Sequence, residues 1–393
     1  MLRVVRIFIF LAAILGSVPS RSEAQMVSPP EWIRADAEEL LGFIDQIAKE
    51  GLDPADYDPS RLRAAISSGN AAALNVLATS TFFHLATDLR QGHVRGNYRI
   101  AWHIPDPPID RAGQQALLAQ ALAAHRVRDA LASLLPVHPD YVALKAALAA
   151  TPLQDRAAIE RMRANLERWR WMPHDLGRRY MFVNVAAFEL QLVEDGKTVS
   201  RHRLVVGKTS TPTPQFSTRA TGLILNPWWD VPQSIIAESV GRLVRTNPAA
   251  ARQRGYVWSR GNVRQRPGPG NALGQMKLVM PNPFTVYIHD TPSKALFEEK
   301  VRAFSHGCIR TQDPFGLAAL LLSSNPGWDR PAMERVVASR VSTKIDFTQS
   351  LPVYVAYFTA ATDTSGAVVA YPDIYGRDRA IVSQLTDAEV TNE

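Results

Sequence analysis

The stretch RYMFVNVAAFELQLVEDGKTVSRHRLVV, residues 179–206, decides the fold of this 393-residue chain. Residues 180–185 and 188–193 are rich in the apolar, aromatic and β-branched side chains that favour strands. The sequence Glu194-Asp195-Gly196-Lys197 then carries the Asp-Gly pair of a tight hairpin turn. The stretch therefore predicts a β-hairpin, and with it a domain of adjacent antiparallel strands.

Further strand-like segments follow, whereas the residues before the hairpin have a helical pattern. Strands are expected at 222–226, 284–289 and 352–359, joined by turns with few helices between them. Alanine and leucine recur at helical spacing over residues 32–148, and another helix is expected at 156–171. The predicted fold class is α+β, with an N-terminal all-α domain followed by a mostly antiparallel β domain.

The segment 1–24 has the layout of a secretory signal peptide. Arg3 and Arg6 precede an apolar run over residues 7–15, and Ser22-Glu23-Ala24 offers a small-x-small cleavage site. An uncleaved membrane anchor is the competing interpretation, but the apolar run reaches roughly a dozen residues against about 20 needed to span a bilayer. We expect cleavage, no membrane span in the mature chain, and a periplasmic location.

The formal net charge of +7 predicts attraction to anionic partners. An exported protein rarely meets nucleic acid, whereas peptidoglycan stem peptides carry several carboxylates and lie outside the cytoplasm. A basic surface that serves only solubility remains the alternative. The single cysteine, Cys308, cannot form an intrachain disulfide, so it is either buried and inert or free and reactive.

The neighbours of Cys308 favour a reactive thiol. They lie in two segments, YIHDT at residues 287–291 and FSHGCIR at residues 304–310. A cysteine nucleophile needs a nearby base or cation to form its thiolate. His306 belongs to the same segment as the cysteine, and His289 belongs to the earlier one. The pattern predicts a cysteine nucleophile with a histidine base.

Two more residues of the second segment suit the same chemistry. Gly307 lets the backbone approach a substrate and frees the cysteine amide to bind an oxyanion. Arg310 is a fork-shaped donor suited to a carboxylate. The alternatives are a cysteine buried in a β core and a zinc site made by His289, His306 and Cys308, which lacks an obvious fourth ligand. We expect no metal and no organic cofactor.

A long excursion at residues 233–275 interrupts the expected β domain. It begins helix-like at 234–238 and then becomes rich in glycine, proline and arginine. Residues 242–277 contain seven arginines and one lysine but no acidic residue. A charge run is often only a solvated face, but a long loop inside a compact domain is commonly functional. We expect this excursion to bind an anionic ligand, with Arg264 and Arg266 taking part.

Around the cysteine, the sequence resembles the L,D-transpeptidases that have a YkuD-type catalytic domain. Their signature is a histidine, roughly fifteen residues, then Ser/Thr-His-Gly-Cys with Asn or Arg two residues further on. Here His289 and Ser305 stand at that spacing, with the segment 290–304 between them. Other segments are similar to the YcbB-like proteobacterial branch of the family: GLDPADY at 51–57, NPWWDVP at 226–232, PGPGN at 267–271, MPNP at 280–283 and PDIYGRD at 372–378.

The resemblance implies the domain bounds and the nature of the fold. A helical scaffold domain is expected over residues 25–155. A YkuD-like β-sandwich catalytic domain is expected over 156–393, with 233–275 inserted as a substrate-capping subdomain. One feature departs from the branch: roughly seventy residues of a peptidoglycan-binding module are missing after residue 150. Wall targeting must then come from the scaffold, the cap or a partner.

The resemblance also assigns roles in the site. It implies that Cys308 is the nucleophile and that His289, rather than the adjacent His306, is the base, its ring oriented by the backbone carbonyl of Asp290. It places the oxyanion contacts at His306, Gly307 and Cys308. It implies a substrate site lined by Tyr287, Arg310, Ser305, Asn282, Trp228, Arg264 and Arg266.

The implied reaction is acyl transfer through a thioester. Cys308 attacks the carbonyl of an L residue joined to a D residue in a donor stem, and a meso-diaminopimelate amine resolves the intermediate. A 3→3 cross-link is favoured and a 1→3 cross-link stays open. The other interpretations are a cysteine carboxypeptidase or amidase that uses water, and a non-catalytic wall-binding protein. The chain has no Ser-x-x-Lys of a penicillin-binding serine enzyme. Stem peptides and other cell-wall enzymes are the expected partners, and carbapenems are expected to acylate Cys308.

Overall fold

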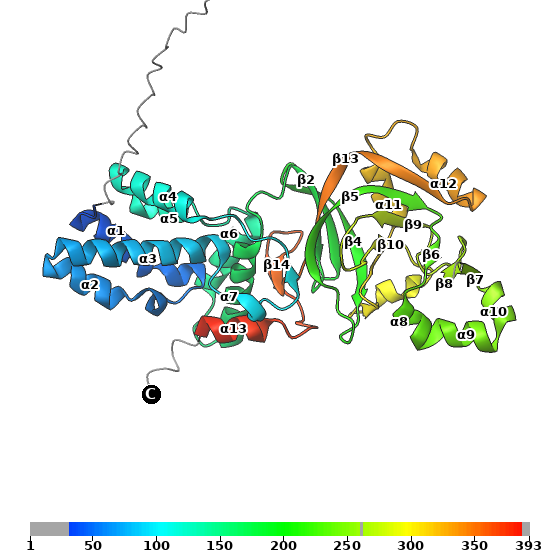
Figure 1. Ribbon diagram of the computed structural model, residues 1–393, viewed down its shortest axis with the longest axis horizontal. Helices are drawn as coiled ribbons and strands as arrows, with labels where there is room; N and C mark the ends of the chain where they lie inside the picture. Colours follow the sequence, from blue (N-terminus) through cyan, green and yellow to red (C-terminus); the bar gives the residue numbers. More distant parts are fainter. Residues whose placement is uncertain (1–30, 260–261, 387–393) are drawn as a thin grey trace, which may run out of the picture.

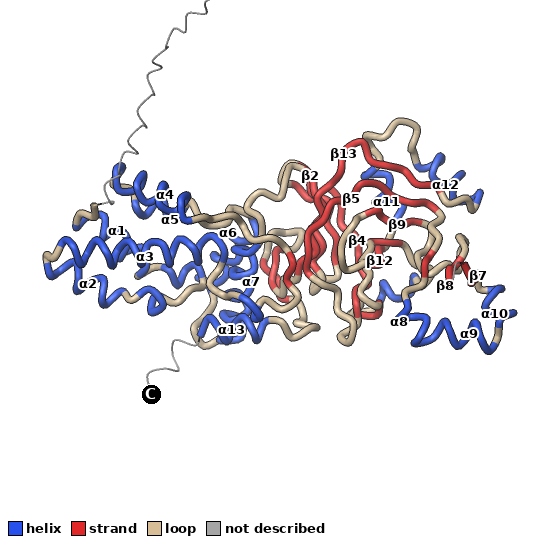
Figure 2. Tube along the Cα trace, in the orientation of Figure 1, coloured by secondary structure: helices blue, strands red, loops and turns tan. Residues whose placement is uncertain are grey.

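The computed structural model describes residues 31–259 and 262–386. The signal peptide predicted for residues 1–24 lies outside these residues. The molecule is elongated, with a helical domain at one end, a β domain in the middle and a small subdomain at the far end (Figure 1). Figure 2 shows the same division as a helical half and a mainly stranded half. Over the described residues, no helix has both the length and the apolar character to cross a membrane.

The helical domain confirms the pattern predicted for residues 32–148. Its helices surround a core built from residues such as Leu40, Phe82, Leu85 and Leu118. The helices are α1 (Arg34–Ile44), α2 (Pro59–Ser68), α3 (Ala71–Gln91), α4 (Arg111–Ala124), α5 (Val127–Ala132) and α6 (Pro139–Ala150), with short turns η1 (Ile47–Glu50), η2 (Pro54–Tyr57) and η3 (Gly96–Tyr98).

Helix α7 (Arg156–Trp171) joins the two domains and has the predicted bounds. The Asp155 carboxylate caps its first turn by accepting from the Ala158 amide. Trp171 packs in the helical core, whereas Trp169 packs with strand residues of the β domain. The C-terminal helix α13 (Asp378–Thr386) returns to the helical domain, where Ile381 and Leu385 enter its core. The two domains therefore share a continuous apolar interface.

A buried carboxylate fixes the end of α3 against α7. Glu167 is fully buried, pairs with Arg170 at 2.6 Å, and accepts from the Val94 amide at 2.7 Å. Gly92 ends α3, and a Cβ atom there would lie 2.4 Å from Glu167 and from Trp171. Only glycine allows this close approach.

The β domain is organised around one ten-stranded sheet. Most of its strand pairings are antiparallel, as predicted, and the hairpin appears as β2 and β3. The strands are β1 (Trp102–His103), β2 (Arg179–Asn184), β3 (Glu189–Glu194), β4 (Lys197–Gly207), β5 (Gln215–Leu225), β9 (Met276–Val279), β10 (Ile288–His289), β11 (Ala303–Ser305), β12 (Ile309–Thr311) and β13 (Thr343–Ala356).

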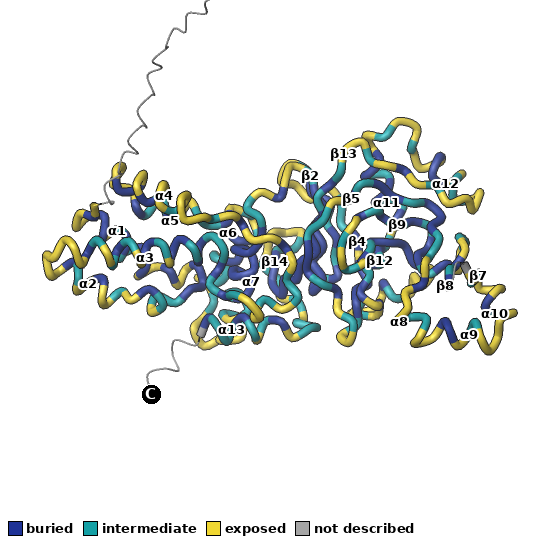
Figure 3. Tube along the Cα trace, viewed as in Figure 1, coloured by how far each residue is buried: buried dark blue, intermediate teal, exposed yellow. Residues whose placement is uncertain are grey.

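This sheet closes on itself. The path runs β5-β13-β2-β3-β4-β12-β10-β9, and β9 pairs back onto β5. Inward-facing residues such as Val183, Leu223, Ile288 and Val355 form one core inside the closed path. Figure 3 shows this interior as the largest buried region of the β half. Helices α11 (Pro314–Leu321) and α12 (Arg330–Ser339), turn η5 (Lys294–Glu298) and the hairpin β14 (Ala360–Thr362) with β15 (Val368–Ala370) complete the domain.

The excursion forms a distinct subdomain, which we call the cap. It has a small apolar core of Val231, Val240 and Val263. Its elements are α8 (Gln233–Ile235), the π-helix η4 (Ile236–Val240), α9 (Gly241–Thr246), α10 (Pro248–Gln253) and the antiparallel sheet of β6 (Trp229–Asp230), β8 (Asn262–Gln265) and β7 (Tyr256–Ser259). The cap lies at the end of the molecule farthest from the helical domain (Figure 1).

Candidate active site

Two short neighbouring strands carry the candidate catalytic residues. Strands β10 and β12 are parallel, with Ile288 opposite Ile309 and His289 opposite Arg310. The Ile309 amide donates to the Tyr287 carbonyl at 2.8 Å, which continues the ladder one step before β10. The structure thus brings together the two separate segments in which the sequence places the cysteine and its candidate base.

The strand register separates a core face from a site face. Ile288 and Ile309 are fully buried in the core of the closed sheet. Side chains alternate between the two faces of a strand. Tyr287, His289, Cys308 and Arg310 therefore lie on the opposite face and share one side of the sheet.

The His289 ring is held in one orientation. Its Nδ1 donates to the Asp290 carbonyl at 2.5 Å, which leaves Nε2 as the basic nitrogen. The side chain is buried, and desolvation together with the charge of Arg310 lowers the pKa of His289 to about 3. The Asp290 carboxylate is itself braced by the Gln275 amide at 2.8 Å and by Lys294. The imidazole is consequently neutral over the physiological pH range.

The Cys308 thiol is half-buried and protonated at rest. Burial raises the pKa of Cys308, against the opposing effects of the Tyr287 amide, Lys277 and Arg310. Its sulfur donates to the Thr285 carbonyl at 3.8 Å. Sulfur and imidazole are thus both neutral in this state, and a thiolate must be generated by transferring the proton to a base.

The turn at residues 305–308 is fixed by side chains on both sides. Ser305 is buried; its hydroxyl donates to the Cys308 carbonyl at 2.5 Å and accepts from the Gly307 amide at 3.1 Å. Gly307 has a φ of 108°, which glycine adopts without strain. Within the described residues, the Cys308 amide has no acceptor, so it is available to an oxyanion.

A second support of this turn was missed in the sequence. The Thr213 hydroxyl is fully buried, donates to the Gly307 carbonyl at 2.9 Å and accepts from the Gly207 amide at 2.9 Å. The Tyr375 hydroxyl accepts from the Thr213 amide at 3.2 Å and donates to the Gly207 carbonyl at 2.6 Å. Arg377 donates to the Thr213 carbonyl at 3.2 Å. These contacts connect the cysteine turn to the C-terminal PDIYGRD segment.

Two cations without carboxylate partners lie beside the sulfur. Within the described residues, neither Arg310 nor Lys277 forms an ion pair. Lys277 lies opposite His289 in the β9–β10 pair, and its ammonium sits 3.8 Å from the centre of the Tyr287 ring. Burial lowers the pKa of both cations. A hollow of about 280 Å³ opens here, lined by Lys277, Asn282, Thr285 and Tyr287 among others.

The His306 ring points toward the cap. Its Nε2 pairs with Glu238 of η4 at 2.7 Å, and Lys208 pairs with the same carboxylate at 3.5 Å. His306 therefore links the cysteine turn to the cap. Its predicted oxyanion contact stays a prediction.

Of the remaining predicted substrate residues, Asn282 and Arg264 have structural partners. The Asn282 amide donates to the Met280 and Val286 carbonyls and so fixes the loop that carries Thr285. Arg264 pairs with Asp230 at 2.6 Å and lies 4.8 Å from the centre of the Trp228 ring. Arg266 is exposed and has no ion-pair partner among the described residues. The positive charge of the acid-free segment 242–277 is thus balanced in part by Asp230, which precedes the segment in the sequence.

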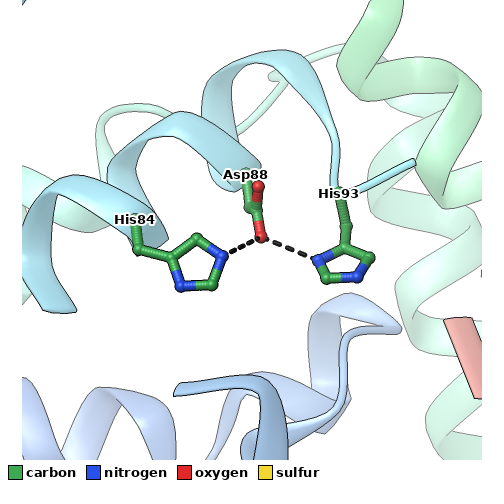
Figure 4. Close-up of side chains that lie close together, drawn as sticks. All are labelled: His84, Asp88 and His93. Carbon is green, nitrogen blue, oxygen red and sulfur yellow. Dashed lines mark hydrogen bonds and ion pairs between the residues drawn. The ribbon is translucent and has the colours of Figure 1, made fainter. Parts of the chain in front are cut away.

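One group in the scaffold has the residue types of a metal site. His84, Asp88 and His93 present ligand atoms within 4.8 Å of one another (Figure 4). The Asp88 oxygens already accept from His93 at 2.8 Å, Tyr57 at 3.0 Å and Arg95 at 3.3 Å. The carboxylate is therefore satisfied as a hydrogen-bonded brace between α3 and η2, and a nearby guanidinium disfavours a cation there.

Comparisons with known proteins match this architecture. Residues 178–344 match the family model of the L,D-transpeptidase catalytic domain, YkuD, and residues 28–148 match a model described as a Scaffold domain. A Haemophilus influenzae protein named "Putative L,D-transpeptidase" is 33% identical over 221 residues, which are 51% of this chain and 45% of that protein. The chain therefore spans less than half of that relative's length.

Solved structures show a weaker similarity. A Mycobacterium smegmatis L,D-transpeptidase has 13% identity and a TM-score of 0.26, over 46% of this chain and 58% of that one. The Enterococcus faecium L,D-transpeptidase catalytic domain has 16% identity and a TM-score of 0.23, over 47% of this chain and 99% of that one. At sequence identities and TM-scores this low, the similarity gives no information about function.

The chain thus combines a helical scaffold with a closed β domain that carries a cysteine and a histidine on neighbouring strands. The catalytic domain belongs to the YkuD-type L,D-transpeptidase family, and a Scaffold domain precedes it.

Proposed function

We propose that this protein is a periplasmic peptidoglycan L,D-transpeptidase that forms peptide cross-links through Cys308. The observation that carries the proposal is the strand register, which puts Cys308 and His289 on one face of neighbouring strands. Nε2 of His289 is the nitrogen left to act as a base, because Nδ1 is committed to the Asp290 carbonyl. The proposal rests on this geometry together with the family of the catalytic domain.

In the proposed first step, His289 takes the thiol proton while the sulfur attacks the carbonyl of an L residue joined to a D residue. The Cys308 amide stabilises the oxyanion. The protonated imidazole then gives its proton to the departing D-amino group, and a thioester remains. In the second step, a meso-diaminopimelate side-chain amine attacks the thioester, and His289 accepts its proton. The imidazole then returns this proton to the departing sulfur, which leaves as the thiol.

Two cations that form no ion pair among the described residues suit this substrate. Arg310 and Lys277 lie beside the sulfur and can each bind a stem carboxylate. We favour a 3→3 cross-link, in which a tetrapeptide is the donor and D-alanine leaves. A 1→3 cross-link uses the same L–D chemistry and the same residues.

Product analysis tests the proposal. Purified protein is incubated with disaccharide-tetrapeptide muropeptides, and the products are identified by mass fragmentation. We expect cross-linked dimers and released D-alanine, and neither product with Cys308→Ala. Tripeptides without dimers would identify a hydrolase that uses water, and unchanged muropeptides would refute an enzymatic role on this substrate.

A further inference from the structure

A second basic hollow lies on the cap, apart from the cysteine. It measures about 620 Å³ and is lined by the 252–256 segment, the loop at 265–271 and the residue after α12. Four exposed arginines surround it: Arg252, Arg254, Arg266 and Arg340. We call it the arginine hollow. It shares no lining residue with the hollow beside Cys308.

The four guanidinium groups have no counterion within the part of the chain that the structure describes. In residues 31–259 and 262–386, no carboxylate lies within ion-pair distance of any of them. Arg264, in strand β8 of the cap, is instead neutralised by Asp230 at 2.6 Å. Like charges gathered around one hollow raise its positive potential and repel one another. Such an arrangement is stabilised when an anion occupies the hollow.

Buried amide side chains fix the backbone at Arg254 and Arg266. Gln265 is 3% exposed and donates to the Arg254 carbonyl at 3.0 Å and to the Gly270 carbonyl at 2.9 Å. Asn271 is 1% exposed and donates to the Arg266 carbonyl at 2.9 Å. The Arg266 amide donates to the Gly255 carbonyl at 2.9 Å. The backbone that carries Arg254 and Arg266 is therefore preorganised, which lowers the entropic cost of binding.

The chemistry of the hollow favours an extended polycarboxylate. Several guanidinium forks suit several carboxylates better than one small anion. A neighbouring hollow of about 270 Å³ shares Arg252, Tyr256 and Arg266, and adds Trp258, whose side chain is 63% exposed. The cationic surface thus continues onto an aromatic one.

We propose that the arginine hollow is a second peptidoglycan site, which binds stem-peptide carboxylates of the intact wall while another stem occupies the site at Cys308. This inference rests on the proposed function, because it takes the substrate to be peptidoglycan. Helix α6 passes into α7 through residues 151–155 alone, so no separate wall-binding module stands between scaffold and catalytic domain. A second site on the cap raises the effective concentration of stems at the first.

Sedimentation with purified, protein-free sacculi tests the site. The test variant carries Arg252→Gln, Arg254→Gln, Arg266→Gln and Arg340→Gln. The matched control carries Arg61→Gln, Arg111→Gln, Arg156→Gln and Arg379→Gln, which are exposed and unpaired arginines of the helical half. Each set removes four positive charges from the net +7. Both are made with Cys308→Ala, so that turnover does not alter the sacculi.

We expect the test variant to bind sacculi at least about tenfold more weakly and the control within about twofold of the parent. The test variant and the parent should bind equally to sacculi whose carboxylates have been amidated with carbodiimide and ammonia. Equal losses in both variants would overturn the inference, because binding would then follow net charge. The inference would also be overturned if the test variant still bound sacculi as the parent does. The same holds if it lost binding to anionic lipid vesicles but not to sacculi.

A second measurement separates this inference from the proposed function. With Cys308 intact and Arg266 unchanged, the substitutions Arg252→Gln, Arg254→Gln and Arg340→Gln should leave reaction with a soluble tetrapeptide within about twofold of the parent. A comparable loss on the soluble peptide would place the arginines in the first site and overturn a separate second one. If the parent binds sacculi through the arginine hollow but never reacts with stem peptides, the proposed function is wrong and the inference of a peptidoglycan site in the hollow is upheld.

Discussion

Substituting Thr213 by valine should loosen the cysteine turn without touching a reacting atom. The change keeps the shape of the side chain but removes a hydroxyl that makes two buried hydrogen bonds. The Gly207 amide and the Gly307 carbonyl lose their partner, and each unsatisfied buried group costs about 1–3 kcal/mol. The extra methyl recovers part of this, so we expect about 2–4 kcal/mol of lost stability.

The cost should also appear in the acylation of Cys308. If about 1.4 kcal/mol of the lost stability raises the free energy of the turn conformation that reacts, acylation slows about tenfold. The assay follows the carbapenem adduct by intact mass over time, alongside thermal unfolding. Thr213→Ser keeps the hydroxyl and should retain the parent rate, since it loses only a methyl group. A valine variant with the parent's acylation rate and melting temperature would refute the positioning role of Thr213.

Two further predictions concern the catalytic pair. Carbapenem should add to the parent protein but not to Cys308→Ala, and an adduct on the alanine variant would place the reactive group elsewhere. The pKa of His289 falls from about 6.5 in an unfolded chain to about 3 in the folded one. As the pH falls, the unfolded chain therefore takes up this proton at a higher pH than the folded one does. The contribution of the neutral His289 ring to the free energy of unfolding is complete above pH 6.5 and is lost as the pH falls toward 3. Urea unfolding at pH 7 and 5 should show about 2 kcal/mol more loss for the parent than for His289→Gln; equal losses would contradict the buried neutral ring.

Local features were predictable from the sequence. The β2–β3 hairpin and helix α7 depend on turn residues, capping and composition within a short window, and both appear where expected. Strand β13 begins at Thr343, well before the predicted start at 352. Its first half, TKIDFTQS, carries polar side chains and forms a strand because β5 pairs with it. Closure of the sheet through β5 and β9 is likewise a long-range pairing that no local pattern reports.

In the candidate site too, residues in a short sequence motif were predictable and residues that arrive from distant segments were not. His289, Cys308 and Arg310 were visible because their types and spacing form a compact frame. Thr213 and Tyr375 were not visible, since they reach the turn from segments that are distant in the sequence. Arg264 was expected to bind an anion because residues 242–277 hold no acid. The β6–β8 pairing brings Asp230 opposite Arg264 from outside that window.

The electrostatics of the site indicate when the proton leaves the sulfur. Burial raises the pKa of Cys308 and lowers that of His289, so both shifts keep the proton on sulfur at rest. The cations Arg310 and Lys277 oppose this by favouring a thiolate, but a bound stem carboxylate would cancel part of their charge. A standing thiolate is therefore least favoured when substrate is present. In the proposed mechanism, proton transfer to His289 then accompanies formation of the sulfur–carbon bond, as the oxyanion takes over the negative charge beside the Cys308 amide.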